Sequence, residues 1–251
     1  VSGRELVLIE AEPIRMGPFL LPVTTLVFAV LVWLSAKATD RLLPEGKVSW
    51  TGPFGGALLL YLILYEVSPL FTDPVIVFQS PLAILYVSGS PKGAIISAGI
   101  TAVYLALVFR RRQISLFRGL DATALIALLT GLGYSFIFQK WGKPTDLPWG
   151  IFIGEGVRVH PIHGYRFLLL AAILFWWWRN RNRWRSGETF TRTALAGGIG
   201  LLILSYFDWE PLTVWLDLSW GQWAFIFIAI AGWLGNMVIT RSERGDRYES
   251  A

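Results

Sequence analysis

The feature that most constrains the fold of this chain is a series of apolar blocks, each about 16 to 22 residues long and separated by charged residues. A helix of about 20 apolar residues is long enough to cross a hydrocarbon core of roughly 30 Å. The composition agrees, because 54% of the 251 residues are hydrophobic and only 16% are charged. We therefore expect an all-α integral membrane protein with about seven transmembrane helices, at Pro18–Ala36, Pro53–Phe71, Gly93–Phe109, Leu120–Phe138, Gly164–Trp178, Thr193–Phe207 and Gly221–Ile239.

The remaining segments complete the expected organisation. The stretch Pro74–Val87 is apolar but short, and two prolines interrupt it, which favours a short re-entrant or interfacial segment. The fifth and sixth blocks are the shortest, so they cross the core only with help from flanking residues. We expect an extracytoplasmic arm over residues 1–15, a transmembrane domain over 16–240 and a cytoplasmic tail over 241–251.

Basic residues are distributed unevenly between the two sides that these spans define. Fifteen of the 22 Lys and Arg residues follow the first, third, fifth and seventh blocks. Cytoplasmic loops carry such an excess, so the N-terminus is expected outside and the C-terminus in the cytoplasm. The net charge of +5 then reflects contact with anionic headgroups, and no nucleic-acid partner is expected. Five outer basic residues fall outside this explanation: Lys92, Lys140, Lys143, Arg158 and Arg166.

Several functional classes are disfavoured by what the chain lacks. It has no cysteine, which excludes a disulfide framework, a thiolate nucleophile and a cysteine-ligated metal centre. Within the expected spans, Glu66 and Asp121 lie near span ends rather than at the bilayer centre. Ion channels and proton pumps need polar groups along the membrane depth, so neither is favoured. A transporter is also disfavoured, because the two halves show no internal similarity.

Both histidines of the protein lie in one outer segment, Arg158–Arg166. Two histidines three residues apart can share a metal on one helical face. Here Pro161 and Gly164 are expected to break the helix between and after His160 and His163, and no carboxylate stands at ligand spacing. We therefore expect a polar loop at headgroup level, with no metal and no cofactor. The next outer segment, Tyr206–Pro211, places Asp208 at the outer surface.

The most specific pattern in the chain lies in the outer segments. The string Gly142-Lys-Pro-Thr-Asp-Leu-Pro-Trp-Gly150 is followed by His160-Pro161 and then by Tyr165. These strings resemble the prolipoprotein diacylglyceryl transferase family, in which a Gly-Arg-Pro-Thr-Asp-Leu-Pro-Trp-Gly type string precedes an Arg-His-Pro-Ser-Gln-Leu-Tyr-Glu string. Weaker similarities are found at Gly17-Pro18, Ser90-Pro-Lys-Gly93 and Gly221-Gln222.

The resemblance covers residues 16 to 240 and is specific over 142–165. It implies a multi-pass protein of the bacterial plasma (inner) membrane, with seven spans and the N-terminus outside. It also implies transfer of a diacylglyceryl group from phosphatidylglycerol to a cysteine thiol of a lipoprotein precursor. That reaction needs a group that takes the thiol proton or lowers the thiol's pKa, and cations that hold the phosphate leaving group.

The chain departs from the family pattern at polar positions. The stretch Thr130–Gln139 falls on the family's signature, where Gly131 stands in place of Arg and Gln139 in place of Glu, and the Asn positions are also replaced. Lys92 stands in place of His, and Asp208 falls near a late Arg. An amide is no general base, a glycine has no side chain to bind phosphate, and a carboxylate repels phosphate. These differences predict the loss of transferase activity.

We therefore expect a catalytically degenerate member of the fold that serves as a lipid-binding or structural subunit of a larger membrane complex. An active transferase with a rearranged site remains the alternative, with Lys92, Lys143, Arg158 and His160 holding phosphate and His163 as a possible base. The expected partners are phospholipid, with phosphatidylglycerol as the candidate, the membrane itself and other membrane-protein subunits. The candidate lipid- or phosphate-binding residues are Lys92, Gln139, Lys143, Arg158, His160, His163, Tyr165 and Gln222.

Overall fold

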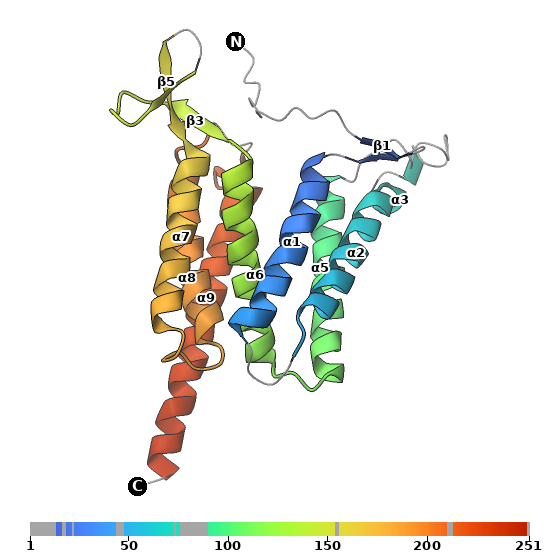
Figure 1. The fold of residues 1–251 in the computed structure, drawn as a ribbon, viewed down its shortest axis with the longest axis vertical. Coiled ribbons are helices and arrows are strands. Elements are labelled where there is room, and N and C mark those ends of the chain that lie inside the picture. Colours follow the sequence, from blue (N-terminus) through green and yellow to red (C-terminus); the bar gives the residue numbers. More distant parts are fainter. Residues whose placement is uncertain are drawn as a thin grey trace. The chain divides into compact units, whose positions relative to one another are not determined.

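The computed structural model describes residues 14–16, 19–21, 23–43, 48–72, 74–75, 90–153, 156–209 and 213–249. The chain divides into two compact units with a boundary between Ala122 and Thr123. We call Ala11–Ala122 the N-terminal unit and Thr123–Ala251 the C-terminal unit. Both are mostly helical (Figure 1).

The described part of the N-terminal unit has a short antiparallel pair of strands and four helices. The strands are β1 (Ile14–Met16) and β2 (Phe19–Leu21). The helices are α1 (Val23–Leu42), α2 (Thr51–Val67), α3 (Pro69–Thr72) and α5 (Pro91–Arg111). At the start of α2 the Asp40 carboxylate accepts hydrogen bonds from the Trp50 backbone N–H and the Thr51 hydroxyl. Since the first N–H groups of a helix lack partners within it, this carboxylate fixes where α2 begins.

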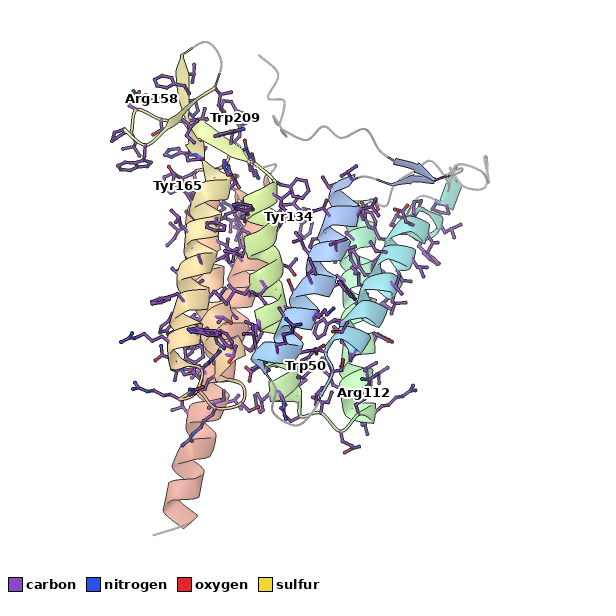
Figure 2. The ribbon with its side chains drawn as sticks, in the orientation of Figure 1. Trp50, Arg112, Tyr134, Arg158, Tyr165 and Trp209 are labelled. Carbon is purple, nitrogen blue, oxygen red and sulfur yellow. The ribbon has the colours of Figure 1, made fainter. Side chains whose placement is uncertain are left out.

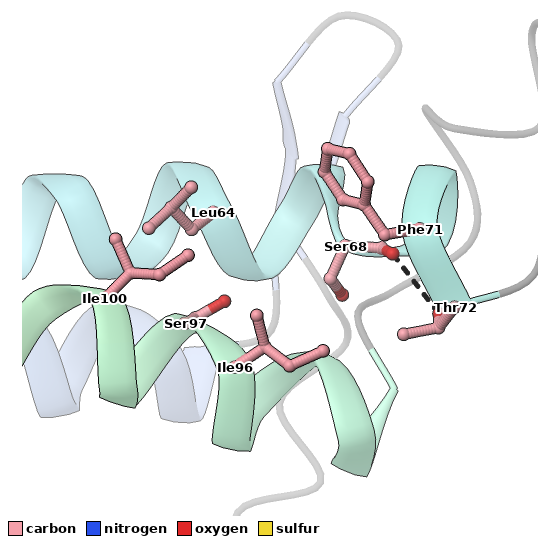
Figure 3. A pocket seen from close by; sticks show the side chains of 7 residues that line it. All are labelled: Leu64, Ser68, Phe71, Thr72, Ile96, Ser97 and Ile100. Carbon is pink, nitrogen blue, oxygen red and sulfur yellow. Dashed lines mark hydrogen bonds between the residues drawn. The ribbon is translucent and has the colours of Figure 1, made fainter.

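Aromatic side chains form the core of the N-terminal unit. Trp50 is fully buried and meets Phe109 of α5 edge to face, with ring centroids 6.1 Å apart. At the other end of α2 a cavity of about 30 Å³, lined by residues of α2, α3 and α5 together with Ser68, is large enough for about one water molecule (Figure 3). It is therefore too small for a lipid acyl chain.

The C-terminal unit contains four helices, a three-stranded sheet and a hairpin. The helices are α6 (Leu116–Ile137), which begins before the unit boundary, α7 (Ile162–Asn180), α8 (Glu188–Ser205) and α9 (Trp220–Glu249). The antiparallel sheet has the order β3 (Trp141–Pro144), β5 (Val157–Pro161), β4 (Ile151–Ile153). The hairpin pairs β6 (Thr213–Trp215) with β7 (Leu218–Ser219).

Glycines let α8 and α9 pack closely. A Cβ atom on Gly198 of α8 would lie 2.7 Å from the Ala229 backbone nitrogen of α9. A Cβ atom on Gly232 of α9 would lie 2.6 Å from the Leu195 nitrogen of α8. Small residues permit this close backbone approach, and they are typical of helix pairs inside membranes.

The helical character that we predicted is confirmed in part. Among the described residues, four helices are long and apolar enough to cross a membrane: Val23–Leu42, Lys92–Arg111, Leu116–Ile137 and Trp220–Arg241. Helix α2 is apolar but shorter. Helices α7 and α8 cover most of the fifth and sixth predicted spans without reaching that criterion. Seven spans therefore remain a prediction.

Two of the predictions need correction, and a third concerns residues outside the described part of the chain. An all-α fold is wrong in detail, because three small sheets are present among the described residues. The first helix begins at Val23 rather than near Pro18, since Phe19–Leu21 pairs with β1 as a strand. The predicted re-entrant segment Pro74–Val87 lies outside the described residues except for Pro74 and Val75.

Candidate functional site

The candidate site is built where the three-stranded sheet meets the start of α7. Figure 1 shows β3 and β5 beside the N-terminal end of α7. Strand β5 ends at Pro161, and Ile162 follows as the first residue of α7. Proline has no backbone N–H to donate and its fixed φ suits a helix start, so the chain changes from strand to helix at this residue. His160 on β5 and His163 on α7 thereby belong to different elements.

His160 lies in an aromatic environment and contacts a predicted site residue. The residue is 7% exposed, and its Nδ1 atom lies 3.1 Å from the Tyr165 hydroxyl oxygen. The ring also packs on Phe207, with centroids 4.9 Å apart. The structure thus brings His160 and Tyr165 together, and Figure 2 labels Tyr165 near the start of α7.

His163 faces a different partner. Its Nδ1 atom lies 3.0 Å from the backbone carbonyl oxygen of Lys140, and its ring meets Trp141 edge to face at 5.0 Å. The expectation that Gly164 breaks the helix after His163 was wrong, because α7 continues through Gly164 to Asn180. A glycine so close to a helix start has little effect, since the helix is stabilised mainly by packing of the later turns. The histidines therefore make two separate sets of contacts, from a strand and a helix rather than from one loop.

Asp208 was predicted at the outer surface, and this prediction was wrong. Its side chain is only 9% exposed, and its Oδ2 atom lies 2.8 Å from an Arg166 guanidinium nitrogen and 3.2 Å from the Lys140 Nζ. Arg166 and Lys140 were among the outer basic residues that membrane orientation left unexplained. The structure accounts for both through one buried carboxylate. Sequence reasoning missed this cluster, although an acidic residue among unexplained basic ones is the signal that could have indicated it.

A glycine makes the cluster possible. The Lys143 backbone N–H donates to the Phe207 carbonyl oxygen at 2.9 Å, and Gly142 pairs with Asp208 as an isolated antiparallel bridge. A Cβ atom on Gly142 would lie 2.2 Å from the Phe207 carbonyl oxygen, closer than any real contact. Only glycine lets β3 approach the Phe207–Asp208 backbone, which places Asp208 beside Lys140.

Two of the predicted cationic residues lie on neighbouring strands. Lys143 on β3 is exposed, and Arg158 on the adjacent strand β5 is half-buried. The Arg158 guanidinium carbon lies 4.5 Å from the Phe152 ring centroid, a cation–π contact. The Arg158 carbonyl accepts the Thr145 N–H at 2.9 Å, which fixes the two strands together. These two cations can face an anionic headgroup outside the protein.

The remaining predicted site residues are Gln222, Gln139 and Lys92. Gln222 is buried, and its Oε1 accepts the Ser219 N–H while the Ser219 hydroxyl accepts the Gln222 N–H, a reciprocal cap at the start of α9. Gln139 is half-buried just after α6. Lys92 is exposed and belongs to the N-terminal unit, at the start of α5.

The stretch Thr130–Gln139 is mostly the last turns of α6, and its central residues pack against other side chains. A Cβ atom on Gly131 would lie 3.1 Å from the Leu170 Cδ1 atom of α7. Leu170 itself belongs to a buried apolar cluster with residues of α6 and α7. Tyr134 packs against Phe138, with ring centroids 4.5 Å apart. Apolar side chains therefore lie beside two of the positions at which the family resemblance implies polar groups, Gly131 and Tyr134, while Tyr134 and Ile137 are also partly exposed.

Comparison with known proteins decides the family. The family model of the prolipoprotein diacylglyceryl transferases matches residues 24–238. This chain belongs to that family. The resemblance predicted from the outer strings is thereby confirmed, and it extends over most of the described helices.

Relatives of the transferase family differ in how much of the chain they match. The phosphatidylglycerol–prolipoprotein diacylglyceryl transferase of Phenylobacterium zucineum is 32% identical over 129 residues, 44% of each chain. That of Methylocella silvestris is 33% identical over 167 residues, 62% of this chain and 58% of the relative. That of Cupriavidus metallidurans is 26% identical over 228 residues, 86% of this chain and 80% of the relative. The match to this chain thus spans less than two thirds of the length of the first two relatives and most of the third.

Proposed function

We propose that this protein is a catalytically degenerate, phospholipid-binding member of the transferase family in a bacterial plasma membrane. Its role is that of a lipid-binding or structural subunit within a larger membrane complex. The ligand class is the phospholipid named for its relatives, phosphatidylglycerol. The observation that carries the proposal is the space at Gly131 of α6, where even an added Cβ would lie only 3.1 Å from the Leu170 Cδ1 atom.

The lost chemistry follows from side-chain types. Gln139 has an amide, which cannot take a proton from a thiol at neutral pH. Gly131 offers no cation to a phosphate leaving group. Each such group contributes about 10²- to 10⁴-fold to the rate of a reaction of this kind. Together these losses remove turnover while leaving the helices and their packing intact.

The retained cations support lipid binding. Lys143 and Arg158 lie on adjacent strands and have no ion-pair partner among the described carboxylates. Arg158 is held against Phe152, so its position is fixed before a ligand arrives. Charge-assisted hydrogen bonds from Lys and Arg are the usual way in which proteins hold phosphate. We place the headgroup of the bound phospholipid at these two residues.

Turnover decides between this proposal and an active transferase with a rearranged site. Purified protein is incubated with labelled phosphatidylglycerol and a peptide carrying the lipoprotein-precursor cysteine. We expect no labelled peptide. Turnover that is abolished by His160→Ala would establish the active alternative, because His160 and Tyr165 would then act in the reaction.

Lipid binding and partners are tested together by native mass spectrometry after gentle membrane extraction. We expect bound phosphatidylglycerol and co-extracted protein subunits. The double variant Lys143→Gln/Arg158→Gln should bind phosphatidylglycerol about thirtyfold more weakly, since each of the two headgroup contacts of a charged residue contributes about 1 kcal/mol. The control Arg183→Gln/Arg185→Gln, on the turn between α7 and α8, removes the same charge. Extraction of a lone chain without lipid would contradict the proposal.

The seven spans and the outside N-terminus also form part of the proposal. Because the chain has no cysteine, a single introduced cysteine reports one position. Asp146→Cys should react with a membrane-impermeant maleimide added outside intact cells, and Arg183→Cys should react only after the membrane is opened. The reverse pattern, or labelling of both from outside, would overturn this topology.

A further inference from the structure

The cluster of Asp208, Lys140 and Arg166 has an unusual distribution of charge for a structural ion pair. Two cations share one carboxylate, and both approach its Oδ2 atom. The Asp208 Oδ1 atom and the Arg166 Nε atom are buried, and neither has a hydrogen-bond partner among the described residues. Arginine usually binds a carboxylate with two parallel hydrogen bonds, and here it uses one.

The donors of this cluster therefore exceed what one carboxylate uses. Arg166 presents a second N–H within the buried region. The Lys140 side chain is 42% exposed, and its ammonium has further N–H groups of its own. An anion with three or four oxygens, such as a phosphate ester, matches two cations of this kind better than a carboxylate does. While Asp208 is ionised, its negative charge opposes the entry of such an anion.

We propose that Lys140 and Arg166 form a phosphate-type anion site that the Asp208 carboxylate occupies as an internal counterion. This inference deepens the proposed function, on which it rests for the lipid class of the ligand. The Asp208 carboxylate keeps phosphate out of the start of α7. Any phospholipid headgroup is left to Lys143 and Arg158, whose cations are not paired with Asp208.

The position of Asp208 is fixed by backbone contacts rather than by the ion pairs alone. Gly142 and Asp208 form a backbone bridge, and the neighbouring Lys143 N–H donates to Phe207. An uncharged isostere at residue 208 can therefore keep its place in the fold. Asp208→Asn removes the charge while preserving the shape, and it frees both cations.

The test measures binding of inorganic phosphate and of a short-chain phosphatidylglycerol to the full chain in non-ionic detergent, by isothermal titration calorimetry. We expect Asp208→Asn to bind phosphate at least tenfold more tightly than the wild type. The control Asp146→Asn removes the same charge from an exposed position and should leave the affinity unchanged. Adding Lys140→Gln to Asp208→Asn should abolish the gain.

Each outcome decides the proposal. A gain with both ligands, or with phosphatidylglycerol alone, supports the site, and the difference tells whether free phosphate or the lipid headgroup is the better ligand. A gain no larger than that of Asp146→Asn, or one that survives Lys140→Gln, overturns the site. Turnover plays no part in this measurement, so an active transferase would defeat the proposed function without bearing on Asp208.

A second measurement applies if Asp208→Asn shows no cooperative unfolding. Lys140→Gln alone changes a side chain that is 42% exposed, so the fold should tolerate it. Because the Asp208 charge already opposes the entry of an anion beside Lys140 in the wild type, phosphate affinity should be the same with and without this substitution. A tenfold loss of affinity would show that Lys140 binds external anions beside Asp208, and would overturn the proposal.

Discussion

The two ends of α7 are both basic, yet their charges meet different environments. At the start of the helix, Arg166 contacts the buried Asp208 carboxylate at 2.8 Å. At its end, the Arg181 guanidinium lies 3.6 Å from the ring centroid of Trp178, which is 50% exposed. The first cation faces a buried carboxylate, and the second faces an exposed aromatic ring. The sign of a charge therefore says less about its role than the group that it faces.

The largest expected effect tests the buried end. Arg166→Gln leaves the Asp208 carboxylate buried with Lys140 as its remaining ion-pair partner, and we expect a loss of about 3 kcal/mol in the free energy of unfolding. Thermal unfolding in detergent measures this loss. Lys143→Gln, at an exposed position on β3, is the control and should change stability by less than about 0.5 kcal/mol. Equal effects of the two variants would show that the ion pair is not structural.

The next effect tests the backbone approach that places Asp208. In Gly142→Ala the new methyl group collides with the Phe207 carbonyl, and we expect a loss of about 2 kcal/mol because β3 must move away. The matched control is Gly164→Ala in the first turn of α7, where the nearest atom to a Cβ is the Pro161 Cβ at 3.9 Å. That substitution should be neutral or stabilise by up to about 1 kcal/mol. Unfolding curves that coincide for the two variants would contradict the close approach.

A smaller effect separates two neighbouring tryptophans at the far end of α7. Trp177 is 1% exposed, and its indole N–H donates to the Thr189 hydroxyl of α8 at 3.2 Å. Trp177→Phe should lower the free energy of unfolding by about 1 kcal/mol through the lost hydrogen bond. Trp178→Phe keeps an aromatic ring at an exposed position and should cost less. A larger loss for Trp178→Phe would mean that its ring is covered, by a partner for example.

The smallest effect concerns the exposed end itself. Arg181→Gln removes a cation–π contact between a half-buried arginine and an exposed tryptophan, for which we expect about 0.5 kcal/mol. Arg183→Gln, at an exposed position, is the control. Chemical denaturation in detergent can resolve the difference if both variants are measured in parallel. If Arg181→Gln destabilises as much as Arg166→Gln does, the two ends of α7 are alike and the comparison fails.

Local features of the fold were predictable, because they depend on residues close together in the chain. The apolar blocks predicted α1, α5, α6 and α9. A membrane-spanning helix is recognised from the length and hydropathy of one continuous stretch, and both can be read directly from the sequence. Boundaries were less accurate, as at Pro18, because strand pairing between β1 and β2 competes with the helix. The spacing of His160 and His163 predicted a shared loop, whereas Pro161 assigns them to a strand and a helix.

The candidate site was predictable only in part, for the opposite reason. The outer strings indicated His160 and Tyr165, which the structure brings together. Asp208 lies 42 residues after Arg166, and Lys140 precedes the three-stranded sheet in the chain. No helical or strand periodicity in the sequence predicts that these residues are in contact. Gln222 looked like a ligand group, yet its amide caps α9 at short range.

The sequence by itself determined that this chain is a mostly helical protein of the transferase family with an excess of basic residues, because apolar runs, charge and strings of residues are properties of the linear chain. Only the tertiary structure decided which of those charges neutralise one another. An ion pair depends on a separation of a few ångströms in space and on exclusion of water. Gly142 supplies that proximity by letting β3 approach Phe207, and burial of Asp208 supplies the exclusion.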